Sequence, residues 1–194
     1  EDDKPAEVGE YRHRFFVPDD VATKRVQLVF EGVMTDTEVR LNGEQVGDLH
    51  QGGFTRFSYS VDELLRPGES NLLEVRVAKE STNRSVNEAE RDADYWVFGG
   101  IFRPVYLDVR PASSISRVAI AADHLGELEL AIELLGDRGR RLEIEIRDPS
   151  SESIVHSTSV PVAGDRVELQ RRVESIRSWS AEFPQLYEIH LALL

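Results

Sequence analysis

The chain has 194 residues, of which 40% are hydrophobic, so it can form one large domain or two small ones with packed cores. Its 36 acidic and 23 basic residues give a net charge of −13, which argues against nucleic acid and anionic membranes as partners. The absence of cysteine excludes disulfides, thiolate catalysis and thiolate zinc sites, and no apolar run approaches the ~20 residues that cross a bilayer.

Apolar and polar side chains alternate with a period of two before residue 112, which is typical of strands with one buried face. Asn42-Gly43 suits both central positions of a type I′ turn, so we expect a tight hairpin over residues 38–47. Pro67-Gly68 predicts another turn. Residues 61–65 could form one helical turn capped by Asp62. The alternating apolar residues are Val26, Leu28, Phe30, Val39, Leu41, Phe57, Tyr59, Val61, Leu73, Val75, Val77, Val105, Leu107 and Val109.

Residues 79–94 break this pattern, because they are polar and hold one large aliphatic residue, Val86. So long a polar connection is uncommon in a compact domain, and we expect either a functional loop or a disordered surface loop. No segment sustains a helical apolar stripe for three turns. The sequence therefore predicts an all-β protein of sandwich type.

A domain boundary is predicted near residues 110–114, where a strand ends at Pro111 and two serines follow. We expect one domain over residues 1–111 and a second over residues 112–194. Six strands in the second part fit an immunoglobulin-like sandwich, which normally has seven. The second domain therefore looks truncated at its last strand, and we expect more chain to follow. The six strands are expected at residues 115–121, 127–134, 142–147, 154–160, 167–173 and 187–193.

Four segments stand out along the chain. Residues 39–47 read VRLNGEQVG, residues 52–57 read GGFTRF, residues 94–107 read DYWVFGGIFRPVYL and residues 178–187 read SWSAEFPQLY. In this order they resemble motifs of family 2 glycoside hydrolases. The third resembles the segment that closes the family's jelly-roll domain, and the fourth resembles a segment of the family's immunoglobulin-like domain. Three residues depart from the common pattern: Arg56 and Ala181 stand where proline is common, and Arg177 where leucine is common.

The resemblance implies a galactose-binding-like jelly-roll sandwich followed by an immunoglobulin-like β-sandwich. In the family a (β/α)₈ barrel follows and supplies two catalytic glutamates, and no strand–helix alternation of that kind occurs here. The resemblance thus implies a non-catalytic N-terminal part of a retaining, β-galactosidase-like exo-glycosidase. Residues 79–98 would shape the carbohydrate pocket, and the downstream catalytic barrel would be the chain's main partner. We expect no catalytic residue and no cofactor in this chain, and we expect the chain to be soluble, in a compartment that the sequence leaves open.

Two residues are the candidate substrate contacts. By the resemblance, Asp94 would bind substrate hydroxyl groups, since charged hydrogen bonds are short and strong, and would help bind a monovalent cation. The intact enzyme could also use a divalent cation. This role need not transfer if the enzyme is a glucuronidase or mannosidase. Trp96 could stack on a sugar ring, although buried aromatic residues more often serve the core.

Two other functions stay open. The chain could be a stand-alone carbohydrate-binding module, because jelly rolls support such modules but a fold does not fix function. It could also belong to a structural or adhesion protein built of tandem sandwiches. The five histidines, which show no metal-ligand spacing, favour neither.

Overall fold

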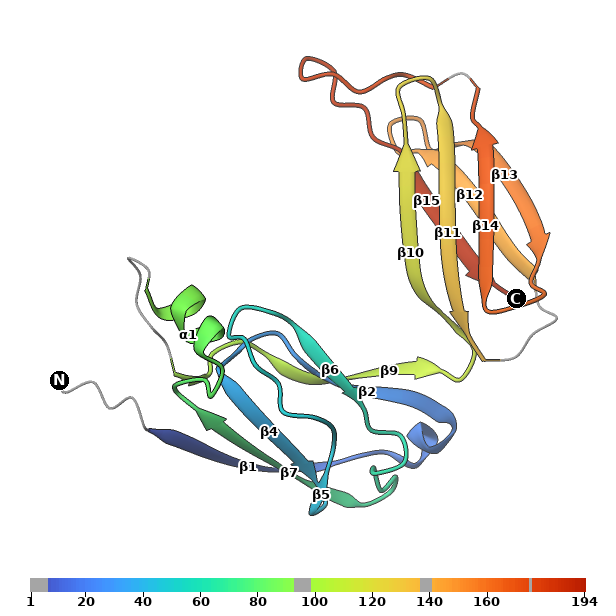
Figure 1. Cartoon of the computed structure of the whole chain (residues 1–194). Helices are drawn as coiled ribbons and strands as arrows, with labels where there is room; N and C mark the ends of the chain where they lie inside the picture. Colours follow the sequence, from blue (N-terminus) through green and yellow to red (C-terminus); the bar gives the residue numbers. More distant parts are fainter. Residues whose placement is uncertain (1–6, 93–98, 137–140, 175) are drawn as a thin grey trace. The chain divides into compact units, whose positions relative to one another are not determined.

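The computed structural model describes residues 7–92, 99–136, 141–174 and 176–194. The chain forms two compact units, Glu1–Pro111 and Ala112–Leu194 (Figure 1). Both are built of antiparallel strands, and α1 (Arg84–Arg91) is the sole α-helix among the described residues. The all-β class expected from the sequence is confirmed.

The first unit contains two larger antiparallel sheets and one small one. One sheet has the strand order β1-β7-β4-β5, the other has β6-β2-β9, and β3 pairs with β8. A short 3₁₀ helix, η1 (Asp19–Thr23), precedes β2. The strands are β1 (Val8–Phe16), β2 (Lys24–Phe30), β3 (Val33–Met34), β4 (Asp36–Leu41), β5 (Glu44–Gln45), β6 (Phe57–Ser60), β7 (Ser70–Ala78), β8 (Gly100–Ile101) and β9 (Val105–Pro111).

Both turns that the sequence predicts in this unit are confirmed. Asn42 and Gly43 have φ values of 55° and 90°, and the flanking residues pair as β4 and β5. Gly68 has a φ of 74°, and the Glu69 N–H donates to the Arg66 carbonyl at 3.2 Å, which closes the turn. Glycine suits both turns because a side chain would be strained at positive φ.

The helical turn expected after β6 is also present, since the Leu65 N–H donates to the Val61 carbonyl at 3.0 Å. The expected cap is wrong. The Asp62 carboxylate accepts instead from the backbone N–H of Val26 in β2, and from the Ser60 hydroxyl at 3.3 Å. Asp62 therefore ties the turn to a neighbouring strand, a contact 36 residues away that local pattern cannot show.

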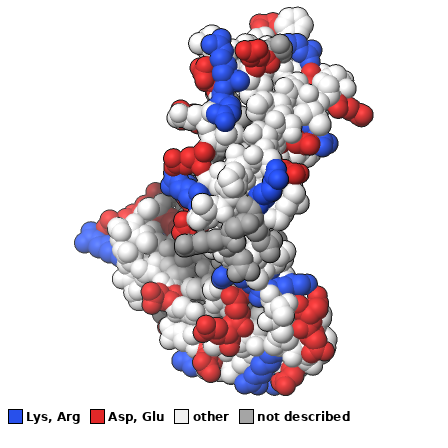
Figure 2. Space-filling model, turned by 90° about the vertical axis from the view of Figure 1, so that its right-hand side faces the viewer, with Lys and Arg blue, Asp and Glu red and all other residues white. Residues whose placement is uncertain are grey.

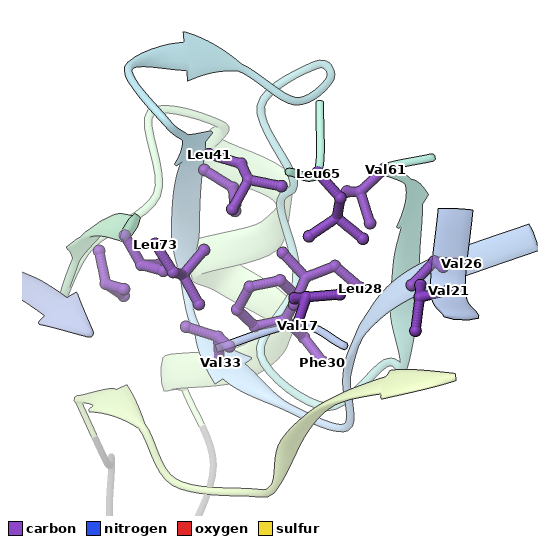
Figure 3. Close-up of a cluster of buried hydrophobic side chains, with 13 residues drawn as sticks. Val17, Val21, Val26, Leu28, Phe30, Val33, Leu41, Val61, Leu65 and Leu73 are labelled. Atoms are coloured by element: carbon purple, nitrogen blue, oxygen red, sulfur yellow. The ribbon is translucent and has the colours of Figure 1, made fainter. Parts of the chain in front are cut away.

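The core of the first unit lies between its two larger sheets. Side chains from the inward faces of β2, β4 and β7 meet there, as the alternation predicts, and residues of the flanking turns close the sides (Figure 3). Each fully buried Val, Leu or Phe stabilises the fold by roughly 1.5–3 kcal/mol relative to exposure. The buried set is Val17, Val21, Val26, Leu28, Phe30, Val33, Val39, Leu41, Val61, Leu65, Leu73, Val75 and Val77.

The second unit is a sandwich of two three-stranded sheets, with the orders β10-β11-β14 and β13-β12-β15. Its core is built from alternating residues of β11, β12 and β14. All six strands expected from the sequence are confirmed to within one residue at either end. On β15 the expected apolar face is present but half-buried. The strands are β10 (Ser114–Ala122), β11 (Glu127–Leu135), β12 (Arg141–Asp148), β13 (Ser153–Pro161), β14 (Arg166–Arg172) and β15 (Glu188–Leu193).

The surface carries charges of both signs. On the face shown in Figure 2, Lys and Arg side chains are scattered among Asp and Glu side chains rather than gathered in one patch. Across the described residues, no helix combines the length and apolarity that a bilayer crossing needs.

Candidate functional site at the α1 end of the first sandwich

The two expected substrate contacts, Asp94 and Trp96, fall within residues 93–98, which lie outside the described residues. The structure does describe the segments on both sides of them. Residues 79–92 come before, and β8 follows directly after Gly99. These segments lie at the end of the sandwich where β7 ends and β4 begins (Figure 1).

The polar connection expected over residues 79–94 contains α1, a helix of eight residues that the sequence pattern does not predict. None of its residues is buried, so it has no apolar stripe for a pattern search to find. The Asn83 side chain caps it by accepting from the Ser85 N–H at 3.1 Å, and Arg84 pairs with Glu88 at 2.6 Å. A helix this short needs further support, because isolated helices below about 12 residues are marginal in water.

Asp36 supplies part of that support at the first residue of β4. One carboxylate oxygen accepts from the Ser81 hydroxyl at 2.5 Å. The other accepts from the Thr82 N–H and hydroxyl, each at 2.8 Å, and from the Gln51 amide at 3.0 Å. Asp36 is 5% exposed, so the chain leading into α1 is fixed to a buried charge. The Ser81 backbone N–H donates to the side-chain oxygen of Asn87 at 2.8 Å, and the Asn87 side-chain amide donates to the Ser81 carbonyl at 2.7 Å.

Asp36 is held in its ionised form. Burial acts to raise the pKa of this carboxyl group, but the hydrogen bonds from Ser81, Thr82 and Gln51 outweigh it and lower the pKa below its ordinary value. The carboxylate therefore stays charged through the neutral range and well into the acid range. With four donors already aimed at it, Asp36 serves as an anchor for the chain.

Glu90 and Arg91 attach the other end of α1. The Glu90 carboxylate accepts from the Gly53 N–H at 2.7 Å and from the Thr35 hydroxyl at 3.4 Å. The Arg91 guanidinium donates to the Lys79 carbonyl at 2.9 Å. Since Thr35 also precedes Asp36 directly, both ends of α1 are fixed to the start of β4.

The chain after residue 98 is fixed as well. β8 pairs with β3 in the register Val33–Ile101 and Met34–Gly100. Gly100 has a φ of 78°, and a Cβ atom there would lie 2.0 Å from the Tyr11 hydroxyl oxygen. Backbone geometry and close packing thus require glycine at this position.

Aromatic side chains lie close to these anchors. Phe54 and Phe102 meet edge to face with ring centroids 6.3 Å apart, and Phe54 is substantially exposed. His50 stacks on Phe57 at 3.6 Å and shares a 2.9 Å hydrogen bond with the Gly52 carbonyl. Burial lowers the pKa of His50, so its ring is neutral at physiological pH and suited to this packed position.

No group of three or more His, Asp or Glu side chains gathers into a metal site among the described residues. Asp94, the expected cation ligand, lies outside them. The described carboxylates at this end, Asp36 and Glu90, are instead occupied by hydrogen-bond donors of the chain.

The sequence did not reveal Asp36, Gln51 or Glu90 as parts of this site. The one local signal is the polar run Thr35-Asp36-Thr37, which stands directly before the apolar alternation of β4 and is buried throughout. The partners of these residues are 15 to 55 positions away, so only the fold brings them together.

A match to a family model decides the assignment. Residues 3–111, more than half of the chain, match the model described as the glycosyl hydrolases family 2, sugar binding domain. The chain belongs to glycosyl hydrolase family 2. The resemblance carried by the four sequence motifs is thereby confirmed.

Curated relatives agree with this assignment. The β-galactosidase of Clostridium acetobutylicum is 32% identical over 189 residues, which cover 95% of this chain and 20% of that protein. The β-galactosidase of Halalkalibacterium halodurans is 32% identical over 200 residues, which cover all of this chain and 19% of that protein. The chain thus spans about a fifth of the length of these two relatives.

Solved structures share the fold. The Faecalibacterium prausnitzii β-glucuronidase is 26% identical with a TM-score of 0.72, and the match covers 94% of this chain and 34% of that one. The Bacteroides uniformis β-glucuronidase, at 22% identity, has a TM-score of 0.76 over 96% of this chain and 24% of that one. The jelly-roll and immunoglobulin-like architecture expected from the motifs is confirmed.

Proposed function

We propose that this chain is the non-catalytic N-terminal part of a retaining exo-glycosidase that hydrolyses O-glycosidic bonds and is most similar to β-galactosidases. In this proposal the first unit shapes the substrate pocket, and the second unit supports the catalytic barrel. The observation that carries it is the double attachment of α1 to β4. Buried or hydrogen-bonded carboxylates there hold a polar segment in place, as a binding rim requires.

The described carboxyl groups fit a scaffold better than a catalyst. A retaining glycosidase needs two carboxyl groups about 5–5.5 Å apart, one of which acts as a general acid with a raised pKa. Every described carboxyl group whose pKa is shifted has a lowered pKa, because the carboxylate accepts hydrogen bonds. In Asp36 the effect of these hydrogen bonds is larger than the opposing effect of burial. This supports the part of the proposal that places the catalytic carboxyl groups outside this chain.

Asp94 and Trp96 are the proposed substrate contacts. By the resemblance of residues 94–107 to the family motif, both side chains would contribute to the substrate pocket. The described segments on either side of them, which end at Asp92 and begin again at Gly99, lie at the α1 end of the sandwich. There Asp94 would bind sugar hydroxyl groups and Trp96 would stack on the ring. A monovalent cation would bind in the intact enzyme with Asp94 as this chain's ligand, and the intact enzyme could also use a divalent cation.

The test compares two polypeptides: this chain, and a longer protein that also contains whatever follows it in the gene. Both are assayed with 4-nitrophenyl β-D-galactoside and 4-nitrophenyl β-D-glucuronide. We expect hydrolysis by the longer protein alone. Turnover by the 194-residue chain, or a longer protein inactive on every aryl glycoside tried, would overturn the proposal.

A second function is sugar binding by the chain alone. The Phe54–Phe102 pair favours it, because Phe54 is substantially exposed and flat aromatic surfaces stack on sugar rings. Calorimetric titration with galactose and with glucuronic acid separates the two functions. Millimolar or tighter binding that is lost in Phe54→Ala would support the carbohydrate-binding module.

A further inference from the structure

An unusual apolar surface lies at one end of the second unit, where the chain between β14 and β15 projects (Figure 1). Trp179, Phe183 and Leu186 in this segment are 61%, 76% and 68% exposed. Ile120 at 56% and Leu125 at 57% extend the same surface. We call these five residues the apolar patch. Ile120, Trp179 and Leu186 line one open hollow of about 470 Å³.

The loop that carries the patch is held firmly by polar contacts on its inner side. The Arg177 guanidinium donates to the Asp148 carboxylate at 2.7 Å and to the Ser150 hydroxyl at 2.9 Å. The Arg177 N–H donates to the Tyr187 hydroxyl at 2.8 Å, which draws the two ends of the loop together. Gln185 adds a 3.2 Å bond to Asp148.

A second group of contacts fixes the tip of the loop. The Ser178 hydroxyl donates to the His124 carbonyl at 2.9 Å. The Ser180 N–H donates to the Phe183 carbonyl at 3.0 Å, and the Phe183 N–H donates back to the Ser180 hydroxyl at 3.1 Å. Several polar groups of this loop are thus bonded to the protein, while its largest apolar side chains are exposed. A group of exposed apolar side chains of this kind marks an interaction surface.

The size of the patch indicates what kind of partner covers it. Taking about 150–250 Å² for a fully exposed large side chain, the five residues present on the order of 600 Å². That is at the upper end for a monomer, yet below the roughly 800 Å² per partner of a stable free-standing complex. A surface of this size is sufficient when the partner is tethered, because the linker supplies an effective concentration near the millimolar range.

We propose that the apolar patch is the surface on which polypeptide following Leu194 in the intact protein docks. This rests on the proposed function, in which a catalytic barrel follows the second unit, and on relatives that are about five times as long as their matched segment. A sugar is a poorer occupant. Its hydroxyl groups would need several polar side chains beside the patch, and those of Arg177, Ser178 and Gln185 are already bonded to the protein, which leaves the exposed Glu182 in this loop.

The test is oxidative footprinting of side chains, read by mass spectrometry, on the 194-residue chain and on the longer protein. Ile154 in β13 is the matched control, because it is 52% exposed and does not line the hollow. We expect labelling of Trp179 and Leu186 to fall at least fivefold in the longer protein while labelling of Ile154 stays unchanged. Equal labelling of Trp179 in both proteins would overturn the proposal, as would a gene that ends at Leu194.

Two controls address other occupants. Protection of Trp179 in the 194-residue chain that rises with protein concentration, with a dimer mass in sedimentation, would assign the patch to a second copy. Protection by added oligosaccharide would assign it to a sugar. Either result overturns the proposal.

A pair of variants tests the energetic consequence. Trp179→Ser with Leu186→Ser should leave the melting temperature of the 194-residue chain unchanged and lower that of the longer protein by several degrees. Ile154→Ser should affect neither. If the double variant leaves the melting temperature of the longer protein unchanged, as Ile154→Ser is expected to do, the patch contributes no docking surface.

Footprinting and activity separate this proposal from the proposed function. A longer protein that hydrolyses glycosides but leaves Trp179 fully labelled refutes the docking surface alone. A longer protein that protects Trp179 but hydrolyses no glycoside refutes the glycosidase function alone.

Discussion

Asp36→Asn is the sharpest test of how the candidate site is built. The substitution keeps the shape of the side chain and removes its charge. Of the four hydrogen bonds at 2.5–3.0 Å, those to the remaining oxygen become neutral, and those to the other oxygen are lost because an NH₂ group donates and cannot accept. A hydrogen bond to a charged group contributes about 1.5–3 kcal/mol and a neutral one about 0.5–1.5 kcal/mol. Because the hydroxyl and amide donors can partly reorient, we expect α1 to lose about 2–4 kcal/mol of its stability against local opening.

Amide hydrogen exchange of residues 84–91 measures that opening directly. Since each 1.4 kcal/mol is a factor of ten, exchange in α1 should accelerate roughly 30- to 1000-fold. Peptides from the second unit should exchange at the wild-type rate. Glu63→Gln is the matched control, because it removes one carboxylate from an exposed side chain of the same unit.

The pH dependence of exchange in α1 independently tests whether the ionised Asp36 carboxylate stabilises the helix. The pKa of Asp36 is lowered in the folded protein by bonds that outweigh burial, so its contribution is fully present above the ordinary aspartate pKa. It is lost as the pH falls through the folded value. Wild-type α1 should therefore open more readily in acid, and Asp36→Asn should remove that acid dependence. Unchanged exchange of α1 in Asp36→Asn would show that this carboxylate does not hold the helix.

Three further predictions follow from other contacts. Gly100→Ala should destabilise the first unit by about 2–5 kcal/mol in urea unfolding, because positive φ and the Tyr11 hydroxyl both oppose a side chain, whereas Gly164→Ala, which meets open space, should be nearly neutral. The pKa of Asp148 is lowered to about 2, first by the Ser150 hydroxyl and also by Arg177, against the opposing effect of desolvation. In a Trp96→Phe background, the fluorescence of Trp179 should therefore stay constant down to about pH 4 and change between pH 4 and 2. Constant fluorescence down to pH 2 would contradict this. Asp94→Asn in the longer protein should lower kcat/KM about 10- to 100-fold, the loss of one charged hydrogen bond to substrate, and wild-type kinetics would remove Asp94 from the site.

Two arginines show how this chain departs from its family without losing the fold. Arg56, where proline is common, pairs with Glu31 at 3.4 Å and reaches the Tyr106 hydroxyl at 3.4 Å. Arg177, where leucine is common, pairs with Asp148. Both positions therefore exchange an apolar residue for a polar contact that only the folded chain provides.

The sequence by itself determined the strands, their turns and the family. A strand with one buried face must alternate with a period of two, so β2, β7 and the six strands of the second unit are visible in the residue order. The turns at Asn42-Gly43 and Pro67-Gly68 can also be predicted from the sequence, because a turn with positive φ values restricts the residues that can occupy it. The motifs over residues 39–57, 94–107 and 178–187 carried the resemblance to the family, which the match to the family model confirmed.

Tertiary structure alone decided how the α1 end of the first unit is held. α1 has no apolar stripe. It is held instead by hydrogen bonds of the Asp36 and Glu90 carboxylates to residues 37 to 46 positions away in the sequence. The outward orientation of Trp179 and Phe183 likewise depends on the bond from Arg177 to Asp148, 29 residues away. Hydrogen bonds and ion pairs between distant residues leave no periodic trace in a sequence, because any polar side chain of suitable reach can make them once the fold has brought it there.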